Sequence, residues 1–250
     1  MRRWAAVREV PLPGGSVHAV VRVGRTVRRP ATPRSGFVRD LLRHFERHGW
    51  PGAPRHLGSD EAGRNVLDYV DGHVAWEPVQ PEAVHSDASL VRTARLVRRF
   101  HDLTAGTALA GDQEVVCHND LSPKNTVYRP VGGALRPVAF LDWDLAAPGQ
   151  RIHDVAHVCW QYLGLGGGAD VTGAARRMRL ICDGYGMADR DALVATVLWW
   201  QDRCASGIEA AADAGDPAMV RLRAAGAVGE VRAARRWVAA HRGELERLLG

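Results

Sequence analysis

The sequence predicts an α+β fold in two parts: a small N-terminal antiparallel sheet with one main helix, and a larger, mostly helical C-terminal part. Two observations carry this prediction. Strand-like apolar alternation covers most of the first 70 residues, whereas apolar residues at helical spacing run from about residue 155 to the end. The pattern changes at Asp71-Gly72, so we expect residues 1–70 and 71–250 to form the two parts.

The first part is expected to have the element order β-β-β-α-β-β. Residues 13–16 (PGGS) are a turn signal between strands. Ser35 can cap a helix over residues 36–48, whose apolar side chains fall on one face, and Gly49 and Pro51 end it. Residues 4–30 alternate like strands broken by turns, so a first strand is expected before residues 13–16. The other strands are expected at residues 17–23, 26–29, 55–58 and 64–70.

The second part begins with a predicted helix over residues 86–104. Short apolar strands that flank polar loops are expected at residues 115–117, 126–128 and 137–141. From about Val155 onward, breaks at residues 164–168, 184–186 and 215–217 divide the chain into about four helical pieces.

The composition limits the kind of protein. The chain has 250 residues and a net charge of +5, and Lys124 is the only lysine among its 33 basic residues. Its arginines are dispersed, without interleaved aromatic residues, so we expect no nucleic-acid partner. No apolar run is typical of a membrane helix or secretory signal, and the four cysteines lie far apart. We therefore expect a cytoplasmic protein without a membrane partner, from a GC-rich bacterium given its Arg, Ala and Gly bias; its oligomeric state is left open.

The most informative segment is VCHNDLSPKNTVY at residues 116–128, a polar loop between two strands with the pattern H-x-D-x-x-x-x-N. A further strand ending in carboxylates, FLDWD, follows at residues 140–144. Phosphoryl transfer needs a carboxylate that orients the acceptor hydroxyl and accepts its proton, and amide and carboxylate oxygens that hold Mg²⁺ on the nucleotide phosphates. Asp120, Asn125 and Asp142 supply these groups in the chain order typical of kinases.

On these motifs the chain resembles the aminoglycoside phosphotransferase-like family of small-molecule kinases, which share a two-lobed, protein-kinase-like fold with choline kinases. The resemblance implies a nucleotide-binding lobe at residues 1–70 and a catalytic, substrate-binding lobe at residues 71–250. It is most specific in the last two of the segments that carry it. These segments lie at residues 20–30, 41–58, 66–72, 95–106, 116–128 and 139–160.

The resemblance also implies roles for individual residues. Asp120 would be the catalytic base, and Asn125 and Asp142 would bind Mg²⁺. Asp144 would be either a further metal ligand or a supporting carboxylate, and Asp154 would support the catalytic loop. Nucleotide contacts are implied for the turn Gly14, Gly15 and Ser16 over the phosphates, and for the hinge Asp68, Tyr69 and Val70 at the adenine or guanine edge.

One position departs from the family pattern. Kinases place a lysine on the third strand to hold the α- and β-phosphates, but the only lysine here lies in the polar loop. Arginine is also a competent phosphate ligand. Strand alternation puts Arg28 and Arg29 on opposite faces, and we favour Arg28. Its partner on the first helix is left open, with Glu46, Asp40 and His44 as candidates.

Two features predict a small-molecule acceptor. Ser122 occupies a position where protein kinases usually carry a lysine, and no segment ending in Ala-Pro-Glu follows Asp142. Between Cys182 and Pro217, seven acidic residues outnumber two arginines. The resemblance places such acids near the acceptor, where they would suit a polycation; the alternative is that they face solvent.

The sequence therefore predicts an enzyme that uses Mg²⁺ to transfer the γ-phosphate of ATP or GTP to a hydroxyl of a small molecule, such as an aminoglycoside-like antibiotic. Two alternatives stay open. In the first, the acceptor is a metabolite such as choline or an amino alcohol. In the second, the missing lysine leaves a catalytically weak, kinase-fold binding protein.

Overall fold

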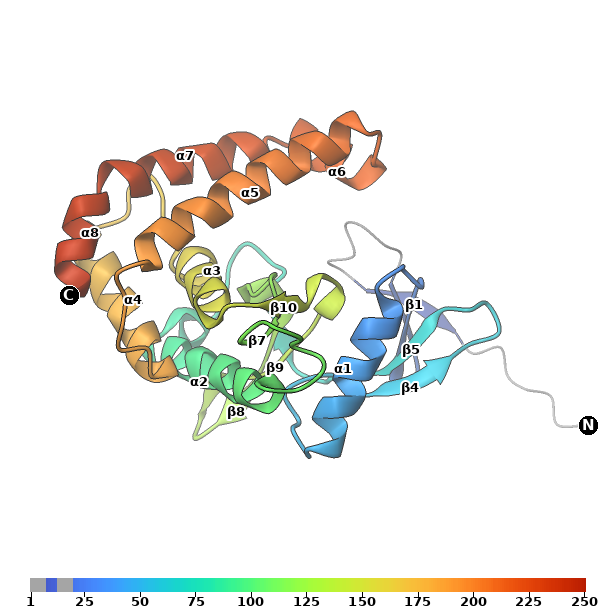
Figure 1. The fold of residues 1–250 in the computed structure, drawn as a ribbon. Helices are drawn as coiled ribbons and strands as arrows, with labels where there is room; N and C mark the ends of the chain where they lie inside the picture. Colours follow the sequence, from blue (N-terminus) through green and yellow to red (C-terminus); the bar gives the residue numbers. More distant parts are fainter. Residues whose placement is uncertain (1–7, 13–19) are drawn as a thin grey trace, which may run out of the picture.

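The computed structural model describes residues 8–12 and 20–250. These residues form a small sheet lobe and a larger helical lobe (Figure 1), which confirms the predicted two-lobed α+β architecture. The predicted turn of Gly14, Gly15 and Ser16 lies outside the described residues. None of the described helices is long and apolar enough to cross a membrane.

The small lobe is a five-stranded sheet that packs against one helix, α1 (Ser35–Arg47). The strand order is β1-β2-β3-β5-β4, and all neighbouring strands are antiparallel. The register of β3 with β5 places Thr26 opposite Asp68 and Arg29 opposite Asn65. The strands are β1 (Glu9–Pro11), β2 (Val21–Val23), β3 (Thr26–Arg29), β4 (His56–Ser59) and β5 (Asn65–Asp68).

Helix α1 is amphipathic, as the sequence predicted. Its buried residues recur at helical spacing: Val38, Leu41, Leu42, His44 and Phe45. The predicted cap is wrong, because Ser35 is the first residue of the helix and no side chain caps it. The Ser35 hydroxyl instead accepts hydrogen bonds from the Thr32 N–H at 2.8 Å and from Asn65 Nδ2 at 2.9 Å. This serine therefore ties the start of α1 to β5.

The chain crosses into the larger lobe between Asp68 and His73. In that lobe, β6 pairs with β8, β8 with β9, and β7 with β10. Gly72 is needed at this crossing, because its φ is +145° and a Cβ there would lie 2.4 Å from Val127 Cγ1. It stays a prediction that residues 1–70 and 71–250 are separate domains. The elements are β6 (His73–Val74), β7 (Val115–Cys117), β8 (Thr126–Val131), β9 (Ala134–Phe140) and β10 (Ala147–Gly149), with short 3-10 helices η1 (Glu82–His85), η2 (Pro123–Asn125) and η3 (Trp143–Leu145).

The C-terminal region has six helices between residues 151 and 249, so the prediction of about four pieces is wrong. The two further breaks lie at Gly226, which has a left-handed φ of +87°, and at His241, which separates the last two helices. The α-helices of the larger lobe are α2 (Asp87–Thr104), α3 (Arg151–Leu163), α4 (Val171–Tyr185), α5 (Leu193–Asp213), α6 (Pro217–Ala224), α7 (Ala227–Ala240) and α8 (Arg242–Leu249).

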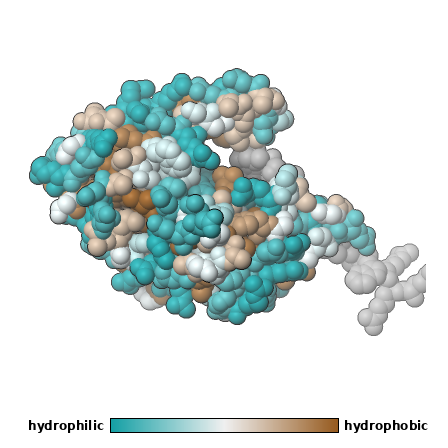
Figure 2. Space-filling view, in the orientation of Figure 1, coloured by the Kyte–Doolittle hydropathy of each residue, from teal (hydrophilic) through white to brown (hydrophobic). Residues whose placement is uncertain are grey.

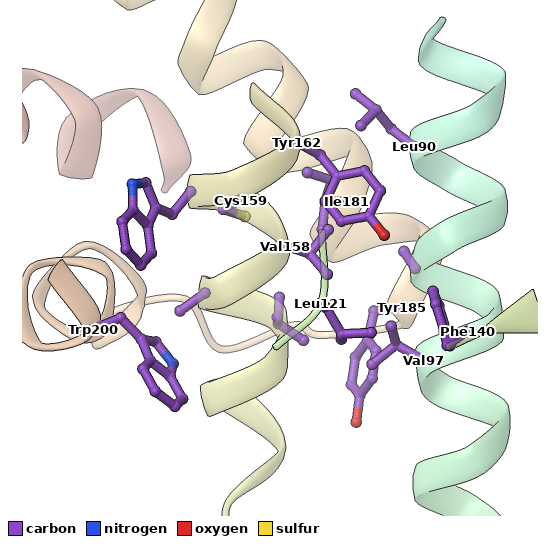
Figure 3. Close-up of a cluster of buried hydrophobic side chains, with 14 of the residues drawn as sticks. Leu90, Val97, Leu121, Phe140, Val158, Cys159, Tyr162, Ile181, Tyr185 and Trp200 are labelled. Atoms are coloured by element: carbon purple, nitrogen blue, oxygen red, sulfur yellow. The ribbon is translucent and has the colours of Figure 1, made fainter. Parts of the chain in front are cut away.

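The core of the larger lobe lies between α2, α3, α4 and α5 (Figure 3). Leu121, in the polar loop after β7, is fully buried in the same cluster and anchors that loop to the helices. The helical side chains drawn there include Leu90, Val97, Val158, Cys159, Tyr162, Ile181, Tyr185 and Trp200.

An aromatic cluster joins the two lobes. Trp143 of η3 is 2 % exposed, and its ring centroid lies 5.1 Å from those of both Phe45 in α1 and Phe100 in α2. Trp50, just after α1, lies 4.7 Å from Phe45. Because Trp143 is held in this cluster, the carboxylates on either side of it have a fixed position relative to α1.

Candidate active site

The polar loop between β7 and η2 is held by one buried carboxylate. Asp154, in the first turn of α3, is fully buried and accepts hydrogen bonds from the backbone N–H groups of His118 at 2.7 Å and Asn119 at 2.9 Å. Asn119 has a φ of 65°, a left-handed conformation that asparagine adopts more readily than most residues. Asp154 thus fixes the backbone turn that carries Asp120.

A chain of polar groups lies behind Asp154. His101 Nε2 donates to Asp154 at 3.0 Å, the Tyr185 hydroxyl donates to His101 Nδ1 at 2.8 Å, and Arg151 donates to that hydroxyl at 3.1 Å. Burial lowers the pKa of His101 in spite of the neighbouring carboxylate. Burial by itself raises the pKa of Asp154, but the hydrogen bond from His101 and the loop N–H groups bring it below the usual value. A neutral histidine and an ionised aspartate therefore support the loop.

Asp120 and Asn125 contact each other within the loop. Asn125 Nδ2 donates to Asp120 Oδ2 at 2.8 Å and to the Asp120 carbonyl at 2.9 Å. His118 Nδ1 accepts the Asp120 N–H at 3.2 Å, and its Nε2 donates to the Leu141 carbonyl at 2.9 Å. Since the amide nitrogen of Asn125 is directed at Asp120, its Oδ1 is directed away from Asp120.

The FLDWD motif begins where β9 ends, and it is tied to the polar loop. The Leu141 N–H donates to the Asn125 carbonyl at 2.8 Å, and Asn119 Nδ2 donates to the Leu145 carbonyl at 3.0 Å. In residues 8–12 and 20–250, Asn119 and Asp142 are the non-glycine residues with positive φ; for Asp142 it is 59°. Such backbone strain is concentrated at functional sites.

A cavity between the lobes combines apolar and charged lining residues. Two of the predicted hinge residues already use their backbone N–H groups, because Asp68 donates to the Arg55 carbonyl at 3.0 Å and Tyr69 to the Arg25 carbonyl at 2.9 Å. The N–H of Val70 has no backbone acceptor in the part of the chain that the structure describes. The lining includes Leu12, Val20, Val27, Leu67, Asp68, Tyr69, Val70, Trp76 and Leu141, together with Arg29, Lys124, Asn125 and Asp142.

The structure corrects the expected assignment of the two arginines on β3. Arg28 lies on the strand face away from the cavity, where it contacts Asp60 at 3.6 Å. Arg29 lines the cavity, donates to Asp142 at 2.9 Å and pairs with Asp144. The expectation for Arg28 is wrong because alternation along β3 turns Val27 and Arg29 to the cavity.

Sequence reasoning missed Val27 and Trp76, which both line the cavity. The sequence held a usable signal for Val27, because it lies on the same strand face as Arg29 two positions later. An apolar residue and a cation placed in this way can contact a nucleotide base and its phosphates. Trp76 gave no such signal. It follows the short strand β6, and its position depends on a hydrogen bond from its Nε1 to the Lys124 carbonyl at 3.1 Å.

The three candidate partners on α1 all have other contacts. Glu46 lies 4.0 Å from Arg55, and Asp40 lies 3.0 Å from its neighbour Arg39. His44 Nε2 donates to the Leu103 carbonyl at 2.7 Å. The acids that contact Arg29 therefore come from the FLDWD motif.

The acidic stretch between Cys182 and Pro217 is largely neutralised. Helices α5 and α6 border a hollow in the surface (Figure 2), but the acids of α5 pair with arginines. The Asp216 carboxylate instead accepts backbone N–H groups at the start of α6. The sequence count missed this because most of the partners lie later in the chain. Four pairs form: Asp183 with Arg190, Asp202 with Arg235, Glu209 with Arg232, and Asp213 with Arg223.

A buried group of possible metal ligands, His101, Cys117 and Asp154, belongs to the support of the loop. Burial raises the pKa of the Cys117 thiol, which donates to the Gln150 carbonyl at 3.2 Å. A protonated thiol is a poor metal ligand. We therefore assign the group a structural role.

Comparisons with known proteins agree with this geometry. Residues 103–193 match the model of the phosphotransferase enzyme family. A trifolitoxin immunity protein from Rhizobium leguminosarum bv. trifolii is 33% identical over 207 residues, which cover 72% of this chain and 75% of that protein.

Two solved structures share the fold. A GDP complex of aminoglycoside 2'-phosphotransferase-IIIa has a TM-score of 0.61 at 14% identity, with 92% of each chain covered. A choline/ethanolamine kinase family protein from Mesorhizobium loti has a TM-score of 0.53 at 17% identity, covering 93% of this chain and 92% of the other. The fold and the site define a small-molecule kinase with a protein-kinase-like fold. The chain belongs to the phosphotransferase enzyme family.

Proposed function

We propose that the protein transfers the γ-phosphate of ATP or GTP to a hydroxyl group of a small molecule. The observation that carries the proposal is that Arg29, Asn125 and Asp142 line one cavity between the lobes, where Arg29 contacts Asp142. Asp120 lies next to them, because its carboxylate accepts a hydrogen bond from Asn125 at 2.8 Å. Phosphoryl transfer depends on positioning and charge stabilisation, and it uses a base, oxygen ligands for a metal, and a cation for the phosphates. These four residues supply all of those groups.

The cavity suits a nucleotide. Its apolar residues would cover the base, and the N–H of Val70 would donate to the base edge. Arg29 Nε is buried and has no hydrogen-bond partner among the described residues. A phosphate oxygen would satisfy this donor, since buried donors rarely lack a partner.

The donor set also suits Mg²⁺. Asn125 would bind through Oδ1, which is directed away from Asp120, and Asp142 would bind through its carboxylate. When bound, the ion neutralises charge on the phosphate oxygens. Asp120, with one oxygen held by Asn125, would orient the acceptor hydroxyl and accept its proton.

The relatives support several acceptor classes. One structural neighbour is an aminoglycoside phosphotransferase and another a choline/ethanolamine kinase family protein, and the 33% identical relative is an immunity protein against a toxin. An aminoglycoside-like antibiotic, an amino alcohol or another hydroxylated toxin would fit these relationships. The arginine pairing of four acids removes most of the negative charge that favoured a polycation.

We also propose a cytoplasmic location, which the four free cysteines support.

A second candidate function is nucleotide binding with little transfer. The observation that favours it is the contact of Arg29 with Asp142 at 2.9 Å, because it occupies an oxygen expected to bind Mg²⁺. This contact must rearrange or be shared before the metal site is complete.

Release of ADP or GDP, measured with aminoglycosides, other hydroxylated antibiotics and amino alcohols, tests the proposal. We expect turnover with at least one acceptor, and loss of about 10²–10⁴-fold of it in Asp120→Ala with nucleotide binding retained. Near wild-type turnover in Asp120→Ala would contradict the role of Asp120. Nucleotide binding without release for any acceptor would favour the second function.

A further inference from the structure

The carboxylates beside Arg29 do not come from α1. In protein kinases the phosphate-binding cation pairs with an acid of the helix that follows the third strand. Here that helix is α1, and a small cavity separates it from the sheet. The α1 side chains that line this cavity, Ser35, Val38, Arg39 and Leu42, include no carboxylate.

Asp144 lies beside the small cavity between α1 and the sheet. It lines the small cavity together with Arg29 and the α1 residues, whereas Asn125 lines the larger cavity. Asp142 lines both. Asp144 is therefore located where an acid of α1 would lie, and on a different side from the expected metal ligand Asn125.

Asp144 is held firmly enough to orient a cation. Its neighbour Trp143 is 2 % exposed in the aromatic cluster, and Trp143 Nε1 donates to the Phe140 carbonyl at 3.0 Å. The side chains of Arg29 and Asp144 are 12% and 24% exposed, so their ion pair is only partly accessible to water. The planar guanidinium group can bind carboxylates through one edge and keep Nε for another acceptor.

We propose that Asp144 is a positioning residue for Arg29, in the place of the α1 carboxylate of other kinases, and that it is not a ligand of Mg²⁺. The inference rests on the proposed function, because Arg29 is assigned there to the nucleotide phosphates. Asp144 accepts from Nη2 of Arg29, which leaves the buried Nε available to donate to a phosphate oxygen. The D-W-D sequence thus combines a metal-binding acid, a core anchor and an arginine-positioning acid.

The two roles of Asp144 differ in their dependence on metal. ADP and GDP binding is measured by titration calorimetry in EDTA and across a Mg²⁺ series. We expect Asp144→Asn to weaken binding in EDTA by about 10- to 100-fold, the usual range for a hydrogen bond to a charged group. The Mg²⁺ concentration that half-saturates the metal effect stays unchanged. Asp142→Asn, by contrast, is expected to raise that Mg²⁺ concentration.

Further variants test whether Asp144 acts through Arg29. Arg29→Ala combined with Asp144→Asn is expected to bind no more weakly than Arg29→Ala alone. Asp144→Glu keeps the charge and is expected to bind more tightly than Asp144→Asn. Asp60→Asn is the matched control, because Asp60 contacts Arg28 on the other face of the sheet, and it leaves nucleotide binding unchanged.

The outcomes separate the inference from the proposed function. Wild-type affinity of Asp144→Asn in EDTA, together with a raised Mg²⁺ requirement, would make Asp144 a metal ligand and overturn the inference alone. Additive losses in the double variant would also overturn it. A wild-type protein that binds neither ADP nor GDP would overturn the proposed function, and the inference with it.

Discussion

The two walls of the cavity between the lobes are held by different kinds of interaction. The polar-loop wall depends on Asp154 and His101, whose side chains are both fully buried. The sheet wall depends on Arg29 and its contacts with Asp142 and Asp144, whose side chains are 46% and 24% exposed. Buried networks are shielded from water, whereas exposed ion pairs are screened by salt. The loop wall therefore keeps Asp120 and Asn125 in fixed positions, whereas the contacts of Arg29 in the sheet wall can change more readily.

The largest effect is expected from Asp154→Ala. The substitution removes a buried carboxylate and leaves the N–H groups of His118 and Asn119 and the His101 ring without their acceptor. We expect the free energy of unfolding to fall by about 3–5 kcal/mol, because each buried donor left without an acceptor costs about 1–3 kcal/mol. Urea unfolding followed by circular dichroism measures this loss.

Asp102→Ala is the matched control for that variant. Asp102 also contacts arginines, Arg98 and Arg151, but its side chain is 44% exposed. Such surface pairs contribute about 0–1 kcal/mol. Equal losses of stability in Asp154→Ala and Asp102→Ala would remove the contrast between buried and exposed supports.

A smaller effect is expected on the sheet wall. Arg29→Ala removes the cavity-facing cation and should weaken ADP or GDP binding by about 10- to 100-fold, without a comparable loss of folding stability. Arg28→Ala, on the opposite strand face, should bind nucleotide like the wild type. Calorimetric titration of both variants decides the assignment, and a loss confined to Arg28→Ala would restore the expectation from the sequence.

The contrast between the walls also explains what the sequence could predict. The polar-loop groups lie within one continuous motif, so spacing alone predicts that Asp120 and Asn125 act together, and the structure shows that their side chains contact each other. The choice between Arg28 and Arg29 depends on which face of β3 covers the cavity. That face is set by packing against residues distant in the sequence, so alternation alone leaves both faces open. Within β3, only the apolar Val27 two positions before Arg29 indicates the face that lines the cavity.

The charge of the helical lobe was harder to predict for a similar reason. Asp202 pairs with Arg235 and Glu209 with Arg232, and in both cases the partner lies on the neighbouring helix α7. A count over one segment of the sequence gives a strong negative charge, but packing of α5 against α7 neutralises two of its acids. The types of the elements, helix or strand, were easier to predict than this charge, because apolar periodicity is a local property of the sequence. Two breaks between helices, at Gly226 and His241, lacked a strong sequence signal.

A loss of stability is also expected in mild acid, and it should come mainly from the loop wall. Burial lowers the pKa of His101 and of His157, whose Nδ1 donates to the Leu121 carbonyl at 2.9 Å. The unfolded chain takes up protons at these residues below their ordinary pKa of 6.5, and the folded chain does not. Their contribution to stability is therefore complete above pH 6.5 and is lost as the pH falls from there toward the folded pKa. The pKa of Asp154 is also lowered, so its contribution is lost only in stronger acid, below its ordinary value of 3.8.

Urea unfolding between about pH 7.5 and about pH 5.5 tests this expectation. For each histidine that stays neutral in the folded state, the free energy of unfolding falls by up to about 1.4 kcal/mol for every unit by which the pH falls below 6.5. His101→Gln keeps polar groups for Asp154 and Tyr185 but does not titrate, so it should reduce the slope by one such step. His56 of the small lobe also has a pKa lowered by burial, but it is more exposed, so His56→Gln should change the slope less. An equal change in both variants would mean that the sheet wall responds to acid as strongly as the loop wall.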